Sequence, residues 1–124
     1  MPQIIESSGP MSAVRRIRME AERRIARGIL VNGVAFRADD ASTQRVGELL
    51  QSFRDGLIGP EGARFRTASG IDLILHSVDA ARRIHEAQRR YRAACLASSA
   101  ALQETRPDDV ASDRHWPSPE QVDL

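Results

Sequence analysis

Several function classes depend on residues that this sequence has in small number. Its 124 residues include one cysteine, one tryptophan and one tyrosine, and every one of its 18 basic residues is an arginine. The single Cys95 cannot form a disulfide within the chain, and no apolar run of signal-peptide length follows a basic start, so we expect assembly in a reducing cytoplasm. No stretch approaches the roughly 18 apolar residues of a membrane span, which predicts a soluble protein.

Groups that would form a reaction or metal site are also scarce. The three histidines are His76, His85 and His115. None has a second ligand at the short spacing that zinc sites use. The acidic pairs at 39–40 and 108–109 lack the alternating oxygen ligands and central glycine of a calcium loop. Cys95 has no candidate base, and no glycine-rich phosphate loop is present. We therefore expect no catalytic, cofactor-binding or metal-binding residues, and no enzymatic activity.

The length supports one modest core. The mass is 13.7 kDa and 41% of the residues are hydrophobic, which favours a single small domain with tails. The net charge is only +1, but it is unevenly distributed: residues 11–28 carry six arginines against two glutamates, and residues 103–124 carry six acids against two arginines. An all-arginine basic set favours planar, bidentate ion pairing.

The stretch that organises the sequence is GILVNGVAFRADDA at residues 28–41. Its Asn32-Gly33 pair stands between two short apolar runs, and a type I′ turn needs the positive φ angles that these two residue types tolerate. The pairs on one face of this predicted hairpin are Ile29 with Phe36 and Val31 with Val34. An isolated hairpin is marginal in water, so the amphipathic segments on either side are expected to cover this face.

Helices are expected on both sides of the hairpin. The first follows Ser12, an N-cap residue, and ends at Gly28. Its apolar positions recur at spacings of three and four and are Val14, Ile17, Ala21 and Ile25. The second begins at one of three alternative N-caps, Asp39, Asp40 or Ser42, and ends around residues 56–60. Its apolar side is expected to carry Val46, Leu49, Leu50, Phe53 and Leu57.

A second hairpin and a third helix complete the pattern. Alternation over residues 63–76, with a turn at 68–70, predicts the hairpin. Its shared face is expected to carry Phe65, Ile71, Leu73 and Leu75. Ser77 is the predicted N-cap of a helix that runs to about Leu102 and spans roughly 39 Å. The stripe on this helix is Ala80, Ile84, Ala87, Tyr91, Ala94 and Cys95. Because the helix is longer than a small sheet needs, its far end is expected to meet another chain.

These elements predict an α+β fold in the order helix, β-hairpin, helix, β-hairpin, long helix. The domain covers residues 11–102, between an extended N-terminal arm at 1–10 and an acidic, proline-containing tail at 103–124. The tail has too few apolar groups to fold alone, so we expect it to be ordered only by contacts outside its own domain. The predicted core comprises Ile17, Ile25, Val31, Val34, Phe36, Leu49, Phe53, Phe65, Leu73, Ile84 and Tyr91.

Three pieces of the sequence are similar to a small domain of unknown function from tailed bacteriophages and prophages, commonly found beside or within tail-fibre genes. They are VNGVAFRADDAS at 31–42, FRTASG at 65–70 and CLASSAAL at 95–102. In that family a turn such as Asn-Gly leads to Phe-x-x-Asp-x-x-Ser, a helix, an aromatic-basic-Thr-x-x-Gly hairpin and a long helix. The resemblance spans residues 23–102. Phe65 stands where the family usually has Trp, and ILHS at 74–77 replaces its Leu-Thr helix entry.

The resemblance implies a virion or virion-assembly context and names no catalytic residue. We expect a structural protein of the bacteriophage tail, at the tail tip, the baseplate or the fibre-attachment region, that acts by oligomeric packing and inter-subunit straps. It would be assembled in the bacterial cytoplasm and reside in the virion tail. The expected partners are other tail proteins and copies of itself. Two alternatives stay open: a tail-fibre assembly factor that the virion does not retain, and an arginine-rich DNA-associated packaging or regulatory module.

The basic first helix and the acidic tail are the expected interface. A row of arginines can neutralise phosphates, but Glu20 and Glu22 interrupt it and no aromatic residues interleave with it, so acidic protein surface is the expected partner. Trp116 lies in the segment least able to bury it, and large aromatic side chains are common interface anchors. The predicted interface residues are Arg15, Arg16, Arg23, Trp116, Asp108, Asp109 and Asp113.

Overall fold

The structure is a computed structural model that describes residues 12–124. The elements in chain order are α2 (Ala13–Arg27), β1 (Ile29–Val31), β2 (Val34–Phe36), α3 (Asp40–Arg54), β3 (Ala63–Arg66), β4 (Asp72–Leu75), α4 (Val78–Thr105), the 3-10 helix η1 (Asp113–His115) and β5 (Gln121–Val122). The predicted α+β order of helix, hairpin, helix, hairpin and long helix is confirmed. The predicted arm at 1–10 lies outside the described residues.

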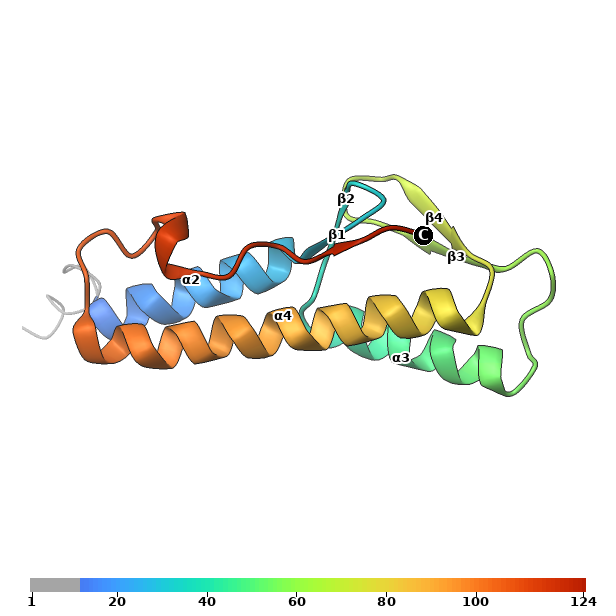
Figure 1. The fold of residues 1–124 in the computed structure, drawn as a ribbon, viewed down its shortest axis with the longest axis horizontal. Helices are drawn as coiled ribbons and strands as arrows, with labels where there is room; N and C mark the ends of the chain where they lie inside the picture. Colours follow the sequence, from blue (N-terminus) through green and yellow to red (C-terminus); the bar gives the residue numbers. More distant parts are fainter. Residues whose placement is uncertain (1–11) are drawn as a thin grey trace, which may run out of the picture.

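Helix α4 is the axis of the molecule (Figure 1). Helix α2 lies along its C-terminal part and α3 along its N-terminal part, and both run antiparallel to it. Strands β2, β1 and β5 form one sheet, in which β1 is antiparallel to β2 and parallel to β5. Strands β3 and β4 form a separate antiparallel pair. In the view of Figure 1 both sheets lie on the other side of α4 from α3, and Arg45 of α3 still reaches the ring of Phe65 in β3, 5.6 Å from its centre. Because α2 and α3 follow one another along α4, the molecule is elongated along that helix.

The first hairpin has the predicted register. Ile29 pairs with Phe36 and Val31 with Val34, and the turn residues Asn32 and Gly33 have φ angles of 50° and 79°. Gly28, which ends α2, must be a glycine because a side chain does not fit at this position. A Cβ there would lie 1.9 Å from the carbonyl oxygen of Phe36, and its φ of 79° disfavours any other residue type.

Side-chain caps set the helix starts. The side chain of Ser12 accepts a hydrogen bond from the backbone N–H of Arg15, and that of Ser77 accepts one from Ala80, as predicted. Of the three alternatives for α3, Asp39 is the cap and accepts from the N–H of Ser42. Helix α4 continues three residues beyond the predicted end and stops where Arg106 adopts a left-handed conformation, with φ of 49°.

The buried side chains form two clusters. The hairpin core lies between the two hairpins, α3 and α4, and includes Ile29, Val31, Phe36, Val46, Phe65, Leu75, Ile84 and Tyr91. The tail core is smaller and consists of Ile17, Ala21, Leu102 and Trp116, with Val110 packed against it. Most predicted core residues are buried, but Val34, Leu49 and Phe53 are only partly buried.

Two apolar residues were wrongly assigned to buried faces. Leu57 is 74% exposed because α3 ends at Arg54, before the helical stripe reaches it. Ile71 is 49% exposed because it precedes β4, in the turn of the second hairpin, where the alternation of faces is not yet established. In both cases the apolar pattern of the sequence continues past the end of the helix or strand.

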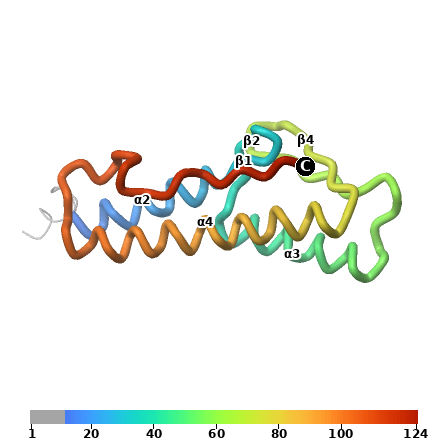
Figure 2. Tube along the Cα trace, in the orientation of Figure 1, coloured from blue at the N-terminus to red at the C-terminus, as the bar shows by residue number. Residues whose placement is uncertain are grey.

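The tail, residues 103–124, was predicted to be ordered only by contacts outside its own domain, and this prediction was wrong. The chain turns back after Arg106, runs over α2 and ends beside the hairpins (Figure 2). Trp116 is buried against Ile17, Ala21 and Leu102, and β5 pairs with β1 through backbone N–H groups of Leu30 and Asn32. One side of the far end of α4 is therefore covered by α2 and the tail of the same chain, and the expected contact of this end with another chain stays a prediction. One large buried ring and two backbone hydrogen bonds between β1 and β5 supply the stability that the sparse apolar composition of the tail did not suggest.

Candidate functional site

Arg24 holds the tail against α2. Its side chain is 2% exposed, and its Nε donates a hydrogen bond of 2.7 Å to Oε2 of Glu20. Its Nη2 donates to Oδ1 of Asp113 at 2.8 Å and to the carbonyl oxygen of Ala111 at 2.9 Å, and its guanidinium lies 5.4 Å from the ring centre of Trp116. A buried arginine is stabilised only when its N–H donors have hydrogen-bond acceptors. For Arg24 one acceptor is the acid Glu20 on the same helix, and two are groups of the tail.

Glu20 completes this clamp. Burial by itself raises the pKa of Glu20, but the hydrogen bonds from Arg23 and Arg24 outweigh burial and hold that pKa below its ordinary value. The carboxylate therefore stays charged at neutral pH and keeps Arg24 in place. We call Glu20, Arg24, Asp113 and Trp116 the tail clamp.

The predicted interface residues are divided between this clamp and the surface. Trp116 and Asp113 belong to the clamp, and the exposed Arg23 pairs with Glu20 at 2.5 Å. Asp109 binds Arg114 at 2.7 Å and His115 at 2.8 Å, both within the tail. Arg15, Arg16 and Asp108 are exposed. The predicted match of acidic tail and basic helix is thus made within one chain, and it involves Arg24, which the sequence analysis did not select.

An exposed hollow adjoins the basic helix on the tail side. It has a volume of about 600 Å³, and Arg16 and Arg23 line it together with Met19 and Val110. Met19 is 45% exposed there. Two of the predicted interface arginines therefore border an apolar surface.

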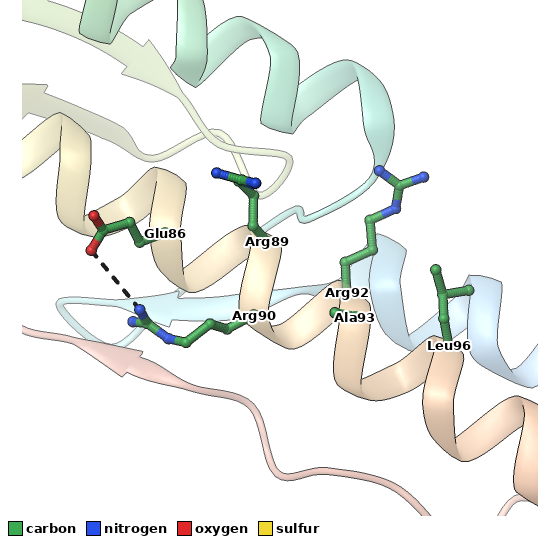
Figure 3. Close-up of a pocket in the computed structure, with 6 residues that line it drawn as sticks. All are labelled: Glu86, Arg89, Arg90, Arg92, Ala93 and Leu96. Atoms are coloured by element: carbon green, nitrogen blue, oxygen red, sulfur yellow. Dashed lines mark ion pairs between the residues drawn. The ribbon is translucent and has the colours of Figure 1, made fainter.

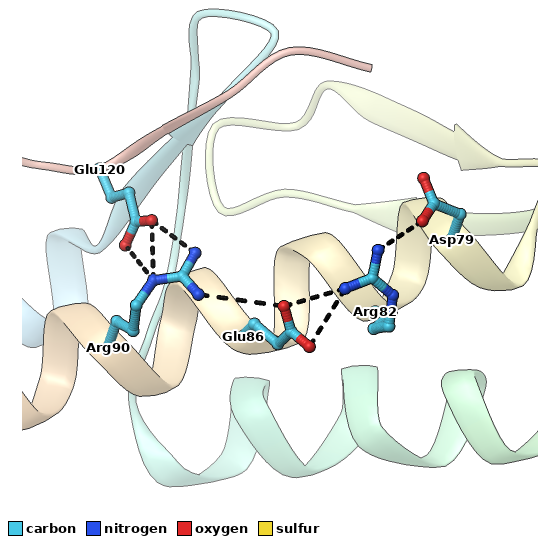
Figure 4. A network of polar contacts seen from close by, with 5 residues as sticks. All are labelled: Asp79, Arg82, Glu86, Arg90 and Glu120. Carbon is cyan, nitrogen blue, oxygen red and sulfur yellow. Dashed lines mark hydrogen bonds and ion pairs between the residues drawn. The ribbon is translucent and has the colours of Figure 1, made fainter.

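The outer side of α4 carries a ladder of ion pairs (Figure 4). Arg82 pairs with Asp79 and Glu86, Glu86 lies 3.9 Å from Arg90, and Arg90 reaches Glu120 of the tail at 2.6 Å. The side chains of this ladder are all partly or largely exposed to solvent. Each ion pair therefore contributes only about 0.2–1 kcal/mol to stability. The ladder orients the side chains of one edge of α4 and joins the tail to it.

A hollow of about 510 Å³ lies beside this ladder (Figure 3). Its lining residues are Glu86, Arg89, Arg90, Arg92, Ala93 and Leu96. Arg89 and Arg92 point toward the α3 side and Arg90 toward the tail, and the half-exposed Leu96 lies further along α4, beyond Arg92 and Ala93. The same face continues along α4 with the exposed Ala97, Ala100 and Glu104. We call residues 89, 93, 96, 97, 100 and 104 the outer face of α4.

The sequence analysis missed this surface because it followed only the buried stripe of the helix. The signal was present, since positions 89, 93, 96 and 100 recur at spacings of four, three and four. A helix at the surface of a protein usually has one apolar face, which is buried, and a polar face toward solvent. A second apolar face that stays exposed is typical of a docking surface.

The buried polar groups of α4 are not poised for chemistry. Burial raises the pKa of Tyr91 to about 12 and raises the pKa of the Cys95 thiol, so both groups stay protonated at neutral pH. Burial also lowers the pKa of His85, beside α3. Within residues 12–124 no three histidine, cysteine, aspartate or glutamate side chains gather in a way that could hold a metal ion.

Comparison of the chain with protein-family models, curated proteins and solved structures gave no significant match. In the part of the chain that the structure describes, no helix combines the length and the apolar sequence needed to cross a membrane.

Proposed function

We propose that the protein is a non-enzymatic structural component of a bacteriophage tail, in the tail tip, baseplate or fibre-attachment region. It acts by binding other tail proteins and copies of itself, and it resides in the virion after assembly in the host cytoplasm. The motifs that resemble the phage domain support this proposal, because they occupy the two hairpins and the long helix.

The observation that carries the proposal is the outer face of α4. Half-exposed Leu96 and three small residues lie between Arg89 and Glu104 on a helix of 28 residues, about 42 Å long. Both parts of this helix are buttressed, one by α3 and the other by α2 and the tail. A rigid apolar surface with a charged rim is the form that protein interfaces take.

The test is quantitative mass spectrometry of particles purified from the host that encodes the chain. A virion component is expected at a fixed ratio to the major tail protein in every preparation. Presence in the lysate together with absence from particles would instead indicate the assembly factor.

The DNA-associated module makes a different prediction. The exposed Arg15 and Arg18 would have to neutralise phosphates, so affinity for duplex DNA would fall steeply with salt. We expect a gel-shift titration at low and physiological salt to give only background binding. Tight, salt-sensitive binding would replace the structural proposal.

A further inference from the structure

The outer face of α4 has a charged residue of opposite sign at each end. Arg89 stands near one end and Glu104 at the other, 15 residues further along, which is about 22 Å of helix. Neither side chain forms an ion pair or a side-chain hydrogen bond with any residue in 12–124, although arginines before and beside Arg89 are paired. Between them the exposed residues are small or apolar: Ala93, Leu96, Ala97 and Ala100.

We propose that this face binds the same face of a second copy of the chain, with the two α4 helices antiparallel. The proposal deepens the proposed function by naming one partner and its surface, and it rests on the same outer face. Antiparallel pairing about a two-fold axis between positions 96 and 97 is the arrangement that matches the charges, because it places the positive end of each face beside the negative end of the other.

The same register also matches the side chains between the charges. Arg89 of one copy lies beside Glu104 of the second copy, and Ala93 lies opposite Ala100. Leu96 lies next to its equivalent at the two-fold axis. Small residues at the crossing let two helices approach closely, and the two leucines become buried where they were half exposed.

Self-complementarity is the reason to choose a second copy as the occupant. A two-fold interface requires that one patch match itself, and the outer face does so at its charged ends, Arg89 and Glu104, and at the small residues Ala93 and Ala100. The hollow on α2 shows no such symmetry, because Glu20 and Arg23 on its rim already pair with each other.

The first experiment is sedimentation equilibrium of the purified full chain over about 1 µM to about 1 mM, the range in which small interfaces associate. We expect a reversible monomer–dimer equilibrium. Leu96→Asp is expected to weaken it at least tenfold with little change in melting temperature, because Leu96 is half exposed. The matched control is Leu57→Asp, at an exposed leucine after α3, which is expected to leave the association unchanged.

Charge exchange tests the register. Arg89→Glu and Glu104→Arg are each expected to weaken the dimer by about tenfold, since each replaces two attractions per dimer by repulsions. The double variant with both changes is expected to recover most of the affinity, and added salt is expected to reduce all of these differences.

A wild-type chain that stays monomeric over the whole range would overturn the inference. Dimerisation that Leu96→Asp leaves unchanged, or that the double exchange does not restore, would assign the contact to another surface or register. Each of these results can occur whether or not the protein is found in particles, so failure of this inference is distinguishable from failure of the proposed function.

Discussion

The hairpin core and the tail core are held together by different kinds of contact. The hairpin core is built mainly from apolar side chains of β1 to β4, α3 and α4, with Ile25 of α2 and Val122 of β5 at its edge, and it contains the pair of rings Phe36 and Phe65, 4.6 Å apart. The tail core is closed by residues far apart in sequence, and Arg24 rather than an aliphatic side chain is the largest fully buried residue beside it.

This difference has an energetic meaning. Loss of packing in the hairpin core removes contacts between most elements of the fold, so the whole domain is expected to unfold together. The tail is joined to α4 through the exposed residues 104–106, so loss of the tail clamp can release the tail while the rest stays folded. We therefore expect the hairpin core to unfold together with the whole domain and the tail core to open locally.

The largest effect is expected for Phe36→Ala. Phe36 is 1% exposed and contacts both hairpins, so truncation should destabilise the fold by roughly 3–5 kcal/mol. Urea denaturation followed by circular dichroism would measure it. Phe53→Ala is the matched comparison, because the structure leaves Phe53 only partly buried and its cost should be clearly smaller. Equal costs for the two variants would contradict the assignment of the core centre.

The next largest effect is expected from removal of residues 107–124. Deletion uncovers Ile17, Ala21 and Leu102 and leaves β1 without its parallel partner, so the melting temperature should fall by several degrees or more. The substitution Trp116→Ala is expected to cause most of this fall and to make the tail sensitive to trypsin at Arg114. An unchanged melting temperature after deletion would mean that the tail core contributes nothing to stability.

A smaller effect is expected for Arg24→Met, which keeps the bulk of the side chain but removes its charge. The tail loses the bonds to Asp113 and Ala111, while Glu20 keeps Arg23 as a partner, so the cost should be about 1–3 kcal/mol. Hydrogen exchange is expected to accelerate in residues 106–122 and to stay unchanged in β3 and β4. Arg23→Met is the control, because Arg23 is exposed and its loss should cost less than about 1 kcal/mol.

The smallest effect is expected for Tyr91→Phe in the hairpin core. The buried Tyr91 hydroxyl has no nitrogen or oxygen hydrogen-bond partner among the described residues and interacts only weakly with the Cys95 thiol, so its removal should raise stability by about 1 kcal/mol near pH 7.

The same variant should change the response to alkali. The pKa of Tyr91 rises from 10.0 to about 12 on folding because burial disfavours the phenolate. Ionisation of Tyr91 therefore leaves stability unaffected below pH 10 and lowers the free energy of unfolding as the pH rises from 10 to 12. Denaturation across that window should therefore show a shallower loss of stability for Tyr91→Phe than for the wild type. Parallel losses in the two proteins would mean that Tyr91 does not titrate with a raised pKa.

Local signals in the sequence determined most of the fold. Asn32-Gly33 set the turn and register of the first hairpin, because few residues other than Asn and Gly accept its φ angles. Ser12, Asp39 and Ser77 set the helix starts, because their side chains satisfy backbone N–H groups only a few residues away. Each of these signals acts within one element or between adjacent elements, so no knowledge of distant contacts was needed.

The tail and the candidate site were decided by the tertiary structure. The sequence showed an acidic tail and a basic helix, but charge alone could not say whether they meet within one chain or between two. The positions of Arg24 beneath Trp116 and of β1 beside β5 settled this for the described chain, since they join residues about 90 positions apart. The outer face of α4 likewise became recognisable only when α2, α3 and the tail had covered the other sides of that helix, because exposure is a property of the packed molecule and not of the sequence.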